Sequence, residues 1–358
     1  MSTIHDVARQ SGVSITTVSM VLNKGNRPVS AESRRRVLEA ARALNYTPNA
    51  NARALVSRRT QAIGVVFGTN LTGLTITNPY VSAVLQGVLD AATELEYVVS
   101  LYSTPWRDAE RDAAAFRNGR VDGVLIFAPV LGSDLVPGLA GLGVPLVVVS
   151  APSGEPGVPW VDIDNRRGVR LAVEHLLALG HTRIAHLMGN IDQANVIERD
   201  DAFRAALSGA GVALPAAYRV DGEYNHESGM KNAHCLLSLP EPPTAIFAGN
   251  DVLALAALDA ARERGLRVPE DLSVVGFDDI PAATLVNPQL TTVRQPLTEI
   301  GARAMRRLVE TIEGRAPEQM VYVLEPELVV RGTTAAPRPE TPRTSPSDSR
   351  SDKRSQPS

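Results

Sequence analysis

The spacing of apolar residues changes near residue 60 of this 358-residue chain. Before that point they recur every three or four positions, which is typical of short amphipathic helices. After it, short and nearly pure apolar runs alternate with amphipathic stretches. The runs predict strands at Ile63–Phe67, Val98–Tyr102, Gly123–Phe127, Leu146–Ser150, Ile184–Met188, Ala245–Ala248 and Ser273–Phe277. The amphipathic stretches predict helices at Val81–Leu95, Glu110–Asn118, Arg167–Leu179, Arg199–Ala210, Ser228–Leu237 and Val252–Arg264.

Strands this apolar, separated by helices, are typical of parallel sheets covered on both faces. Two successive sets of strands predict two lobes. We expect Thr291–Pro296 and a helix at Leu297–Glu313 to return the chain to the first lobe, and Val321–Leu324 to be a late crossover. The segment from Ala335 onward is rich in Pro, Ser, Thr, Arg and Asp and has no apolar period, which predicts disorder.

The N-terminal stretch predicts two short helices joined by a tight turn. Thr3 is a good N-cap with Asp6 three positions later, and Gly12 suits the turn. Ser14 can cap the second helix, whose apolar positions share one face. Those positions are Val18, Val21 and Leu22. The pattern predicts a helix-turn-helix, a motif that usually places its second helix in the DNA major groove.

A third helix is expected after the N-cap Ser30, with apolar residues at helical spacing until Asn45. The next segment, Pro48–Val56, is too short to form an isolated helix in water. Its small alanines and single leucine, Leu55, suit a segment that folds in a DNA minor groove, with Leu55 as an apolar wedge between base steps.

Two motifs together resemble the headpiece and hinge of the lactose-repressor/galactose-repressor family. They are V-S-x-x-T-V-S-x-V-L-N at Val13–Asn23 and N-A-x-A-R-x-L at Asn49–Leu55. The resemblance continues to about Thr333. It implies an α/β chain: a three-helix headpiece and a hinge helix, then a bilobed periplasmic-binding-protein-like body with two parallel sheets. The expected domains are 1–47 (helix-turn-helix), 48–61 (hinge helix and linker), 62–333 (effector binding and dimerisation) and 334–358 (disordered tail).

The distribution of charge supports a DNA reader. Residues 1–60 carry ten Lys or Arg and three Asp or Glu, whereas the whole chain carries 36 and 39. The body is therefore acidic and the head basic, which is the expected electrostatic footprint, although charge alone would also fit a solvated basic face. The lone cysteine, Cys235, excludes an internal disulfide, and we expect a buried thiol.

The resemblance implies base contacts at Ile15, Thr16 and Met20 in the second helix. Family members often carry Arg at the position of Met20, where it can bind a guanine in bidentate fashion. Met20 cannot do so, and an alternative is that it packs inward; we favour exposure because other residues fill the inner face. The remaining expected DNA contacts are Thr3, Ser14, Thr17, Ser19, Asn23, Arg34, Asn49, Ala52, Arg53 and Leu55. A central CpG step is expected in the operator, since pyrimidine–purine steps kink readily.

The resemblance also implies an effector site at the carboxyl ends of the strands. Arg199 matches the family's ligand-binding arginine, although a salt bridge with Asp200 or Asp201 is the alternative. Asn250 and Asp278 end strands and can hold paired hydroxyls, which favours a sugar or polyol. Asp251 could be only an N-cap. The other expected effector residues are Tyr80 in an N-P-Y turn, Tyr224 as a stacking aromatic, and Gln193 and Asn195.

Gln193 is neutral where purine-responsive relatives carry a basic residue, so we favour a sugar inducer over a nucleoside or other co-repressor. The loop 69–77 is longer than the usual family pattern and leaves ligand size open. The predicted function is a homodimeric repressor that binds a palindromic double-stranded DNA operator under the control of a small molecule.

Two other functional classes compete with this prediction. A sugar-binding transport protein would share the body, but the headpiece and the lack of an apolar N-terminal signal run argue against it. An enzyme would need a nucleophile–base pair, a metal-spaced cluster or a phosphate loop, and the sequence shows none of them. His175, His181 and His186 are expected to be structural. We expect no cofactor, no metal, no membrane span and a cytoplasmic location.

Overall fold

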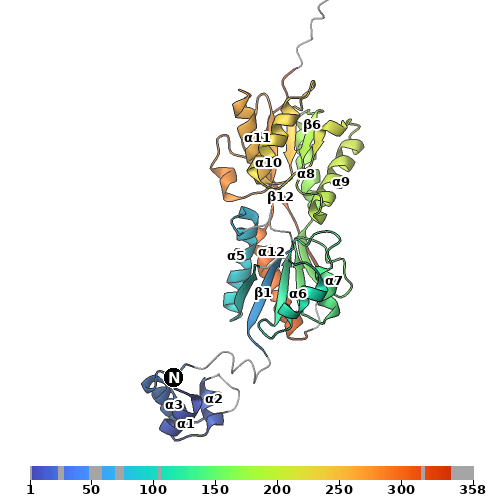
Figure 1. The fold of residues 1–358 in the computed structure, drawn as a ribbon. Helices are drawn as coiled ribbons and strands as arrows, with labels where there is room; N and C mark the ends of the chain where they lie inside the picture. Colours follow the sequence, from blue (N-terminus) through green and yellow to red (C-terminus); the bar gives the residue numbers. More distant parts are fainter. Residues whose placement is uncertain are drawn as a thin grey trace, which may run out of the picture. The chain divides into compact units, whose positions relative to one another are not determined.

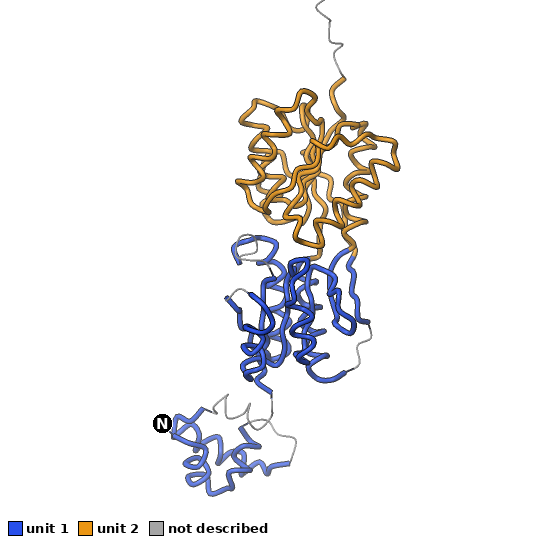
Figure 2. The backbone as a smooth tube through the Cα atoms, turned by 45° about the vertical axis from the view of Figure 1, so that its right-hand side comes forward, with its two compact units in different colours: residues 1–163, 297–324 blue, residues 164–296, 325–358 orange. Residues whose placement is uncertain are grey.

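The computed structural model describes residues 2–22, 28–47, 59–68, 76–103, 106–315 and 319–339. They form a helical headpiece and two α/β lobes (Figure 1). Two compact units are distinguished in Figure 2: residues 1–163 with 297–324, and residues 164–296 with 325–358. Apart from the headpiece, the first unit is the first lobe, with described residues 59–163 and 297–324; the second unit is the second lobe, described to residue 339. The chain therefore crosses between lobes three times. In the described part of the chain, no helix is long and apolar enough to span a bilayer.

The headpiece contains α1 (Ile4–Ser11), α2 (Ile15–Leu22) and α3 (Ala31–Ala43). The predicted capping box is present, because Thr3 and Asp6 bond reciprocally. Gly12 takes the left-handed conformation, with φ +64°, that the turn requires. Ser14 and Ser30 cap α2 and α3 through their hydroxyls. The small core is Val7, Ala8, Val18, Val21, Val37, Ala40 and Ala41.

The first lobe is built on a parallel sheet of order β11-β5-β4-β3-β1-β2. Its strands are β1 (Ala62–Phe67), β2 (Val98–Tyr102), β3 (Gly123–Phe127), β4 (Leu146–Val149), β5 (Trp160–Ile163) and β11 (Val321–Leu324). Its helices are α5 (Pro79–Glu94), α6 (Ala109–Asp112), the 3-10 turn Ala113–Phe116, α7 (Leu135–Gly141) and α12 (Leu297–Ile312). Helices α5 and α12 approach closely because glycines face the partner backbone: a Cβ on Gly87 would lie 1.8 Å from the Thr298 carbonyl oxygen.

The second lobe repeats this plan with sheet order β12-β10-β9-β8-β6-β7. Its strands are β6 (Ile184–Leu187), β7 (Arg219–Val220), β8 (Ala245–Ala248), β9 (Ser273–Asp278), β10 (Thr291–Arg294) and β12 (Glu327–Val329). Its helices are α8 (Asn165–Ala178), α9 (Ala194–Gly209), α10 (His226–Leu237) and α11 (Asp251–Glu263), with 3-10 turns at Ala216–Tyr218 and Pro281–Thr284.

Alternating strand residues bury both faces of this second sheet. Ile246 of β8 belongs to the cluster formed with α10 and α11. The next residue, Phe247, stacks instead with Phe203 of α9 on the opposite face. Figure 1 shows α8 and α9 on one side of the sheet and α10 and α11 on the other. The predicted α/β fold with two mainly parallel sheets is confirmed.

Several local predictions are wrong. Thr291–Arg294 is β10 of the second-lobe sheet, so the chain returns to the first lobe at Leu297 instead. The expected helix Glu110–Asn118 is only a short turn of α-helix followed by a 3-10 turn. Strand β12 pairs antiparallel with β10, so the second sheet is not wholly parallel. Cys235 is exposed. Strands β5, β7 and β12 and helix α7 were not predicted from the apolar pattern.

The start of the expected disordered tail is ordered. The Ala335 carbonyl oxygen lies 2.9 Å from His181 Nε2, and the Ala335 N–H donates to Ser273 Oγ at 3.1 Å. Arg338 pairs with Asp271. Since residues 334–339 pack on the second lobe in this way, the predicted boundary at 334 is too early. The three histidines are structural as expected: His175 contacts Thr334, His181 also contacts Thr244, and His186 is buried.

Candidate functional site

One face of helix α2 is turned away from the headpiece core and carries both polar and apolar side chains. Val18 and Val21 are buried, whereas Ile15 is 41% exposed and Thr16 is exposed. Met20 is half-buried and does not belong to the residues that pack against the headpiece core. The inward-packing alternative for Met20 is therefore not supported. The face holds two apolar side chains and one hydroxyl, which suits contact with thymine methyl groups and base-edge acceptors.

The flanking polar residues divide by their role in the headpiece. The hydroxyls of Thr3 and Ser14 are engaged in caps, and Thr17 Oγ1 lies 2.9 Å from Ser14 Oγ. Arg34 is exposed on α3, and Ser19 is half-buried. The predicted contacts Asn23, Asn49, Ala52, Arg53 and Leu55 lie outside the described residues, as do most of the hinge segment and residues 69–75 of the long loop.

The chain just after the hinge segment is anchored on the first lobe. The carboxylate of Asp122 accepts from the backbone N–H of Thr60 at 2.7 Å and from that of Gln61 at 2.8 Å. It also accepts from the Thr60 hydroxyl at 2.8 Å. The carboxylate of the half-buried Asp122 thus fixes the point at which the linker joins β1.

Arg199 is the centre of a buried polar group in the second lobe. Its side chain projects from α9 and is 3% exposed. Nε donates to Asn165 Oδ1 at 2.9 Å, and Nη1 donates to the Gly249 carbonyl oxygen at 2.6 Å. The guanidinium lies 3.8 Å from the centroid of the Phe277 ring, a cation–π contact. The surface salt-bridge alternative is excluded, because Asp200 pairs with Arg204 and Arg219, and Asp201 with Arg204.

Asp278 ends β9 beside this arginine. Its Oδ1 accepts from Gln295 Nε2 at 2.6 Å, and its carbonyl oxygen accepts from the Gln295 N–H at 3.2 Å. Burial, together with the negative charge of Asp251, raises the pKa of Asp278 well above its usual value, despite the opposing charge of Arg199. A buried carboxyl beside a guanidinium can both accept from and donate to ligand hydroxyls.

Asp251 is a fully buried carboxylate and not the helix cap. The cap of α11 is Asn250, whose Oδ1 accepts from the Leu253 N–H at 2.9 Å. Asp251 accepts from the Ile280 N–H at 2.8 Å and from the Thr292 hydroxyl. Burial raises the pKa of Asp251 to about 6. The cap uses the oxygen of Asn250 and not its amino group, which suits the predicted donation to a ligand.

Tyr224 lies against the backbone of Gly189. A Cβ on Gly189 would come within 2.1 Å of Tyr224 Cζ, so only glycine allows this position of the ring. The Tyr224 hydroxyl is buried beside the Arg199 guanidinium, but it makes no hydrogen bond of good geometry within the described residues. Burial raises the pKa of Tyr224 to about 12. A buried hydroxyl with so weak a partner is stabilised when a ligand or water meets it.

The other predicted effector residues are distributed between the lobes. Gln193 is buried at the start of α9, and Asn195 Oδ1 is buried without a partner among the described residues. Tyr80 begins α5 in the first lobe, where its hydroxyl donates to Ser150 and Asn78 caps the helix. Within the second lobe, Arg199 and Asp278 belong to one buried polar group. For Tyr80 the effector role stays a prediction.

Sequence reasoning missed three contributors to this group: Asn165, Gln295 and Asp251. Asn165 follows the Asp164 cap of α8, and Gln295 precedes Pro296, so both looked like ordinary boundary residues. Asn165 follows β5, which the apolar pattern did not predict, and Gln295 lies in the segment Thr291–Pro296 that was expected to return to the first lobe. The sequence therefore gave no direct signal for either residue. Within the described ranges, no group of three or more His, Cys, Asp or Glu could hold a metal ion.

Two family models match the chain. Residues 3–49 match the bacterial regulatory proteins of the lacI family, and residues 173–334 match the periplasmic binding protein-like domain. The HTH-type transcriptional regulator DegA of Bacillus subtilis (strain 168) is 37% identical over 342 residues, covering 93% of this chain and 98% of its own. The chain belongs to the lacI family of bacterial regulatory proteins. It is therefore a transcriptional regulator.

Two solved structures extend this finding. The lac repressor dimer bound to operator and the anti-inducer ONPF matches with a TM-score of 0.83 and 32% identity, covering 94% of this chain and 99% of that one. The complex of the transcriptional regulator CelR with cellobiose matches with a TM-score of 0.71 and 35% identity, covering 93% and 100%. The relatives named here are regulators and not enzymes. The family resemblance seen in the sequence is confirmed.

Proposed function

We propose that this lacI-family protein is a repressor that binds a two-fold DNA operator as a homodimer and releases it when a sugar or related polyol binds the second lobe. The observation that carries the effector part is the buried group of Arg199, Asp278 and Tyr224. It combines a guanidinium, a carboxyl and a buried hydroxyl near one another on elements of a single lobe. Charged partners strengthen hydrogen bonds to hydroxyls.

The DNA part is supported by the headpiece. A single headpiece buries little surface, so two copies on related half-sites are needed for tight specific binding. Ile15, Thr16 and Met20 are offered to base edges by α2, and Arg34 is exposed for phosphate contact. The lac repressor relative is a dimer bound to operator. The basic head predicts an affinity that falls steeply with salt, because bound counterions are released.

The sugar class is favoured over a nucleoside by the neutral Gln193 and by the guanidinium, amide and carboxyl of Arg199, Asn250 and Asp278, each of which can bind paired hydroxyls. The CelR relative is in complex with cellobiose. A co-repressor would strengthen operator binding instead of weakening it. The direction of the response therefore separates the two candidates.

The test has two stages with the full chain. Binding-site selection from random duplexes should return a palindrome, and its affinity should fall by about 10³ or more between 50 and 200 mM salt. Cellobiose, lactose, ribose and guanine are then added singly, with melting temperature and operator anisotropy recorded together. A sugar that raises the melting temperature and weakens operator binding is expected. A one-sided footprint, or a response to guanine alone, would contradict the proposal.

A further inference from the structure

Two of the three chain crossings between the lobes have nearby residues that bond to the residues proposed to bind the effector. The crossings fall between Ile163 and Asp164, between Pro296 and Leu297, and between Leu324 and Glu325. At the first two, a side chain within three residues on the second-lobe side is bonded to Arg199 or to Asp278. At the third, Glu327 is bonded to Arg294, which in turn is bonded to Asp279 beside Asp278. All of these contacts are internal to the second lobe.

The first contact joins Arg199 to the first crossing. Asn165 is the second residue after that crossing and is 1% exposed. Its Oδ1 accepts from Arg199 Nε at 2.9 Å, and its Nδ2 donates to Glu198 Oε2 at 3.1 Å. Asn165 is therefore held by two successive residues of α9. A shift of the arginine must be met by a shift of Asn165, because water does not replace a buried bond freely.

The second contact joins Asp278 to the second crossing. Gln295 is the second-last residue before that crossing and is 4% exposed. It binds Asp278 twice, through its side chain at 2.6 Å and through its backbone N–H at 3.2 Å. Its own Oε1 is buried without a hydrogen-bond partner among the described residues. The side-chain NH2 group of Gln295 therefore donates to Asp278, while its oxygen is left without a partner among the described residues.

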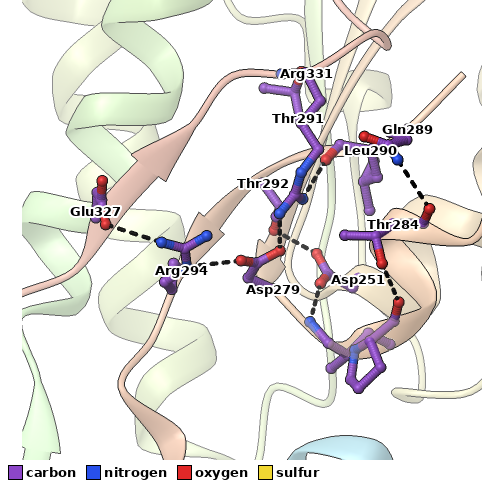
Figure 3. A network of polar contacts seen from close by, with 12 residues as sticks. Asp251, Asp279, Thr284, Gln289, Leu290, Thr291, Thr292, Arg294, Glu327 and Arg331 are labelled. Atoms are coloured by element: carbon purple, nitrogen blue, oxygen red, sulfur yellow. Dashed lines mark hydrogen bonds and ion pairs between the residues drawn. The ribbon is translucent and has the colours of Figure 1, made fainter.

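The third contact fixes the turn that carries Asp278. Asp278 and Asp279 have φ of +130° and +60°, conformations that L residues rarely adopt, so the turn needs support. Asp279 accepts from Arg294 Nε at 2.7 Å and from Arg331 Nη2 at 2.6 Å. Figure 3 shows Arg294 between Asp279 and Glu327, which it meets at 3.3 Å. Arg294 and Glu327 each lie three residues from a crossing, Arg294 before the second and Glu327 after the third.

We propose that Asn165 and Gln295 are positioning residues that transmit effector binding at Arg199 and Asp278 to the chain crossings. This inference rests on the proposed function. A ligand that hydrogen-bonds to the Arg199 guanidinium and the Asp278 carboxyl alters their bonds to Asn165 and Gln295. These two residues lie close in sequence to the points where the chain leaves the second lobe. The ligand changes operator affinity only through its different affinity for the two states of the protein. The bonds of Asn165 and Gln295 to Arg199 and Asp278 supply this difference in ligand affinity.

A purely structural role for the two amides makes a different prediction. In that case their removal would lower sugar affinity, stability and response together. Transmission instead predicts that the response is lost even at sugar concentrations that saturate the variant, whereas a purely structural role predicts that the response returns at saturation. The ratio of operator affinities with and without sugar isolates this coupling from binding itself.

The test compares Gln295→Ala and Asn165→Ala with Gln289→Ala in the full chain. Gln289 is the control, because its side-chain amide donates at 3.1 Å to the Thr284 carbonyl oxygen in the same lobe (Figure 3), a bond that involves neither Arg199 nor Asp278. Cellobiose, lactose and ribose serve as probes. Calorimetry gives sugar affinity, and anisotropy on the selected operator gives the effect of the sugar. Melting curves identify any variant that fails to fold. If one of the two amide variants does not fold, the other amide variant tests the inference.

With the wild type and Gln289→Ala, a binding sugar should change operator affinity by roughly 5- to 150-fold. With either amide variant the change should fall to about 2-fold or less even when the sugar saturates the variant, as judged by calorimetry. Retention of the full change by both folded variants overturns the inference but leaves the proposed function intact. If no probe sugar binds the wild type, the proposed sugar control fails and this inference fails with it.

Discussion

The ring of Tyr224 lies directly on Gly189, where a Cβ would come within 2.1 Å of Tyr224 Cζ. This contact sets the position of the aromatic face proposed to meet the sugar. Gly189→Ala should therefore displace Tyr224 and weaken sugar binding by at least about tenfold, since misplacement of an aromatic removes packing and orientation together. Overpacking should also lower stability by about 1–3 kcal/mol. Calorimetry and urea unfolding measure the two effects.

Gly209→Ala is the matched control. Gly209 is in α9 of the same lobe, and nothing lies within 4 Å of an added Cβ. Alanine should leave sugar affinity unchanged and stabilise the helix by about 0.5–1 kcal/mol. Equal sugar affinity in Gly189→Ala and the wild type would show that Tyr224 does not contact the sugar.

The elements that sequence predicted well are those with a local signal. The caps at Thr3, Ser14 and Ser30 and the turn at Gly12 follow from side-chain chemistry within three or four residues. Most buried strands of the two sheets follow from their apolar runs, but β5, which contains Asp162, does not. These features need no knowledge of tertiary contacts.

The missed elements depend on distant partners. Edge strands β7 and β12 are two and three residues long and carry no apolar run of their own. The contacts of Asn165 with Arg199 and of Gln295 with Asp278 span 34 and 17 residues and connect polar side chains, for which periodicity gives no signal. Family motifs identified Arg199 and Asp278 but not the residues that hold them.

The buried carboxyl of Asp251 predicts a pH-dependent stability. Its pKa is raised from 3.8 to about 6 by burial, so the native state binds more protons than the unfolded state between these values. The free energy of unfolding should therefore fall as pH rises from about 4 to 6, and the cost is fully present above pH 6. About two pKa units correspond to a cost on the order of 3 kcal/mol.

Asp251→Asn should flatten this profile, and unfolding by urea at several pH values between 4 and 7.5 measures it. The stability of the variant relative to the wild type should improve as pH rises. Asp192→Asn, at an exposed position, should keep the wild-type profile. A constant difference between Asp251→Asn and the wild type at all pH values would argue against a raised pKa.

Met20 predicts the base preference of each half-site. Its side chain is half-buried on the face of α2 that is not in the headpiece core, and it offers only apolar contact. Met20→Arg should shift the selected base toward guanine at one symmetric position per half-site, with a discrimination of about 1–3 kcal/mol. Binding-site selection with both proteins checks this. Identical motifs would remove Met20 from the set of base readers.

Leu55 is predicted to wedge between the central base steps of the operator. Leu55→Ala should weaken specific binding, reduce DNA bending and leave sugar affinity unchanged, because the wedge offsets part of the unstacking cost. A central pyrimidine–purine step such as CpG should be selected by the wild type. Gel-phasing assays measure the bend, and the same bend angle for the wild type and the variant would exclude the wedge.

A substitution at Asp278 should affect sugar binding without affecting DNA binding. Its buried carboxyl accepts from Gln295 Nε2 at 2.6 Å and belongs to the second lobe, whereas the DNA-reading face belongs to α2 of the headpiece. Asp278→Ala removes a carboxyl that hydrogen-bonds the sugar and leaves the sugar hydroxyls it met unpaired in a buried site, which costs about 1–3 kcal/mol. We therefore expect operator affinity within about 2-fold of the wild type, with sugar affinity lowered by about tenfold or more and the response lost. Asp192→Ala should respond to sugar like the wild type. If Asp278→Ala keeps full sugar affinity in calorimetry, the effector site lies elsewhere even though the DNA-binding function stands.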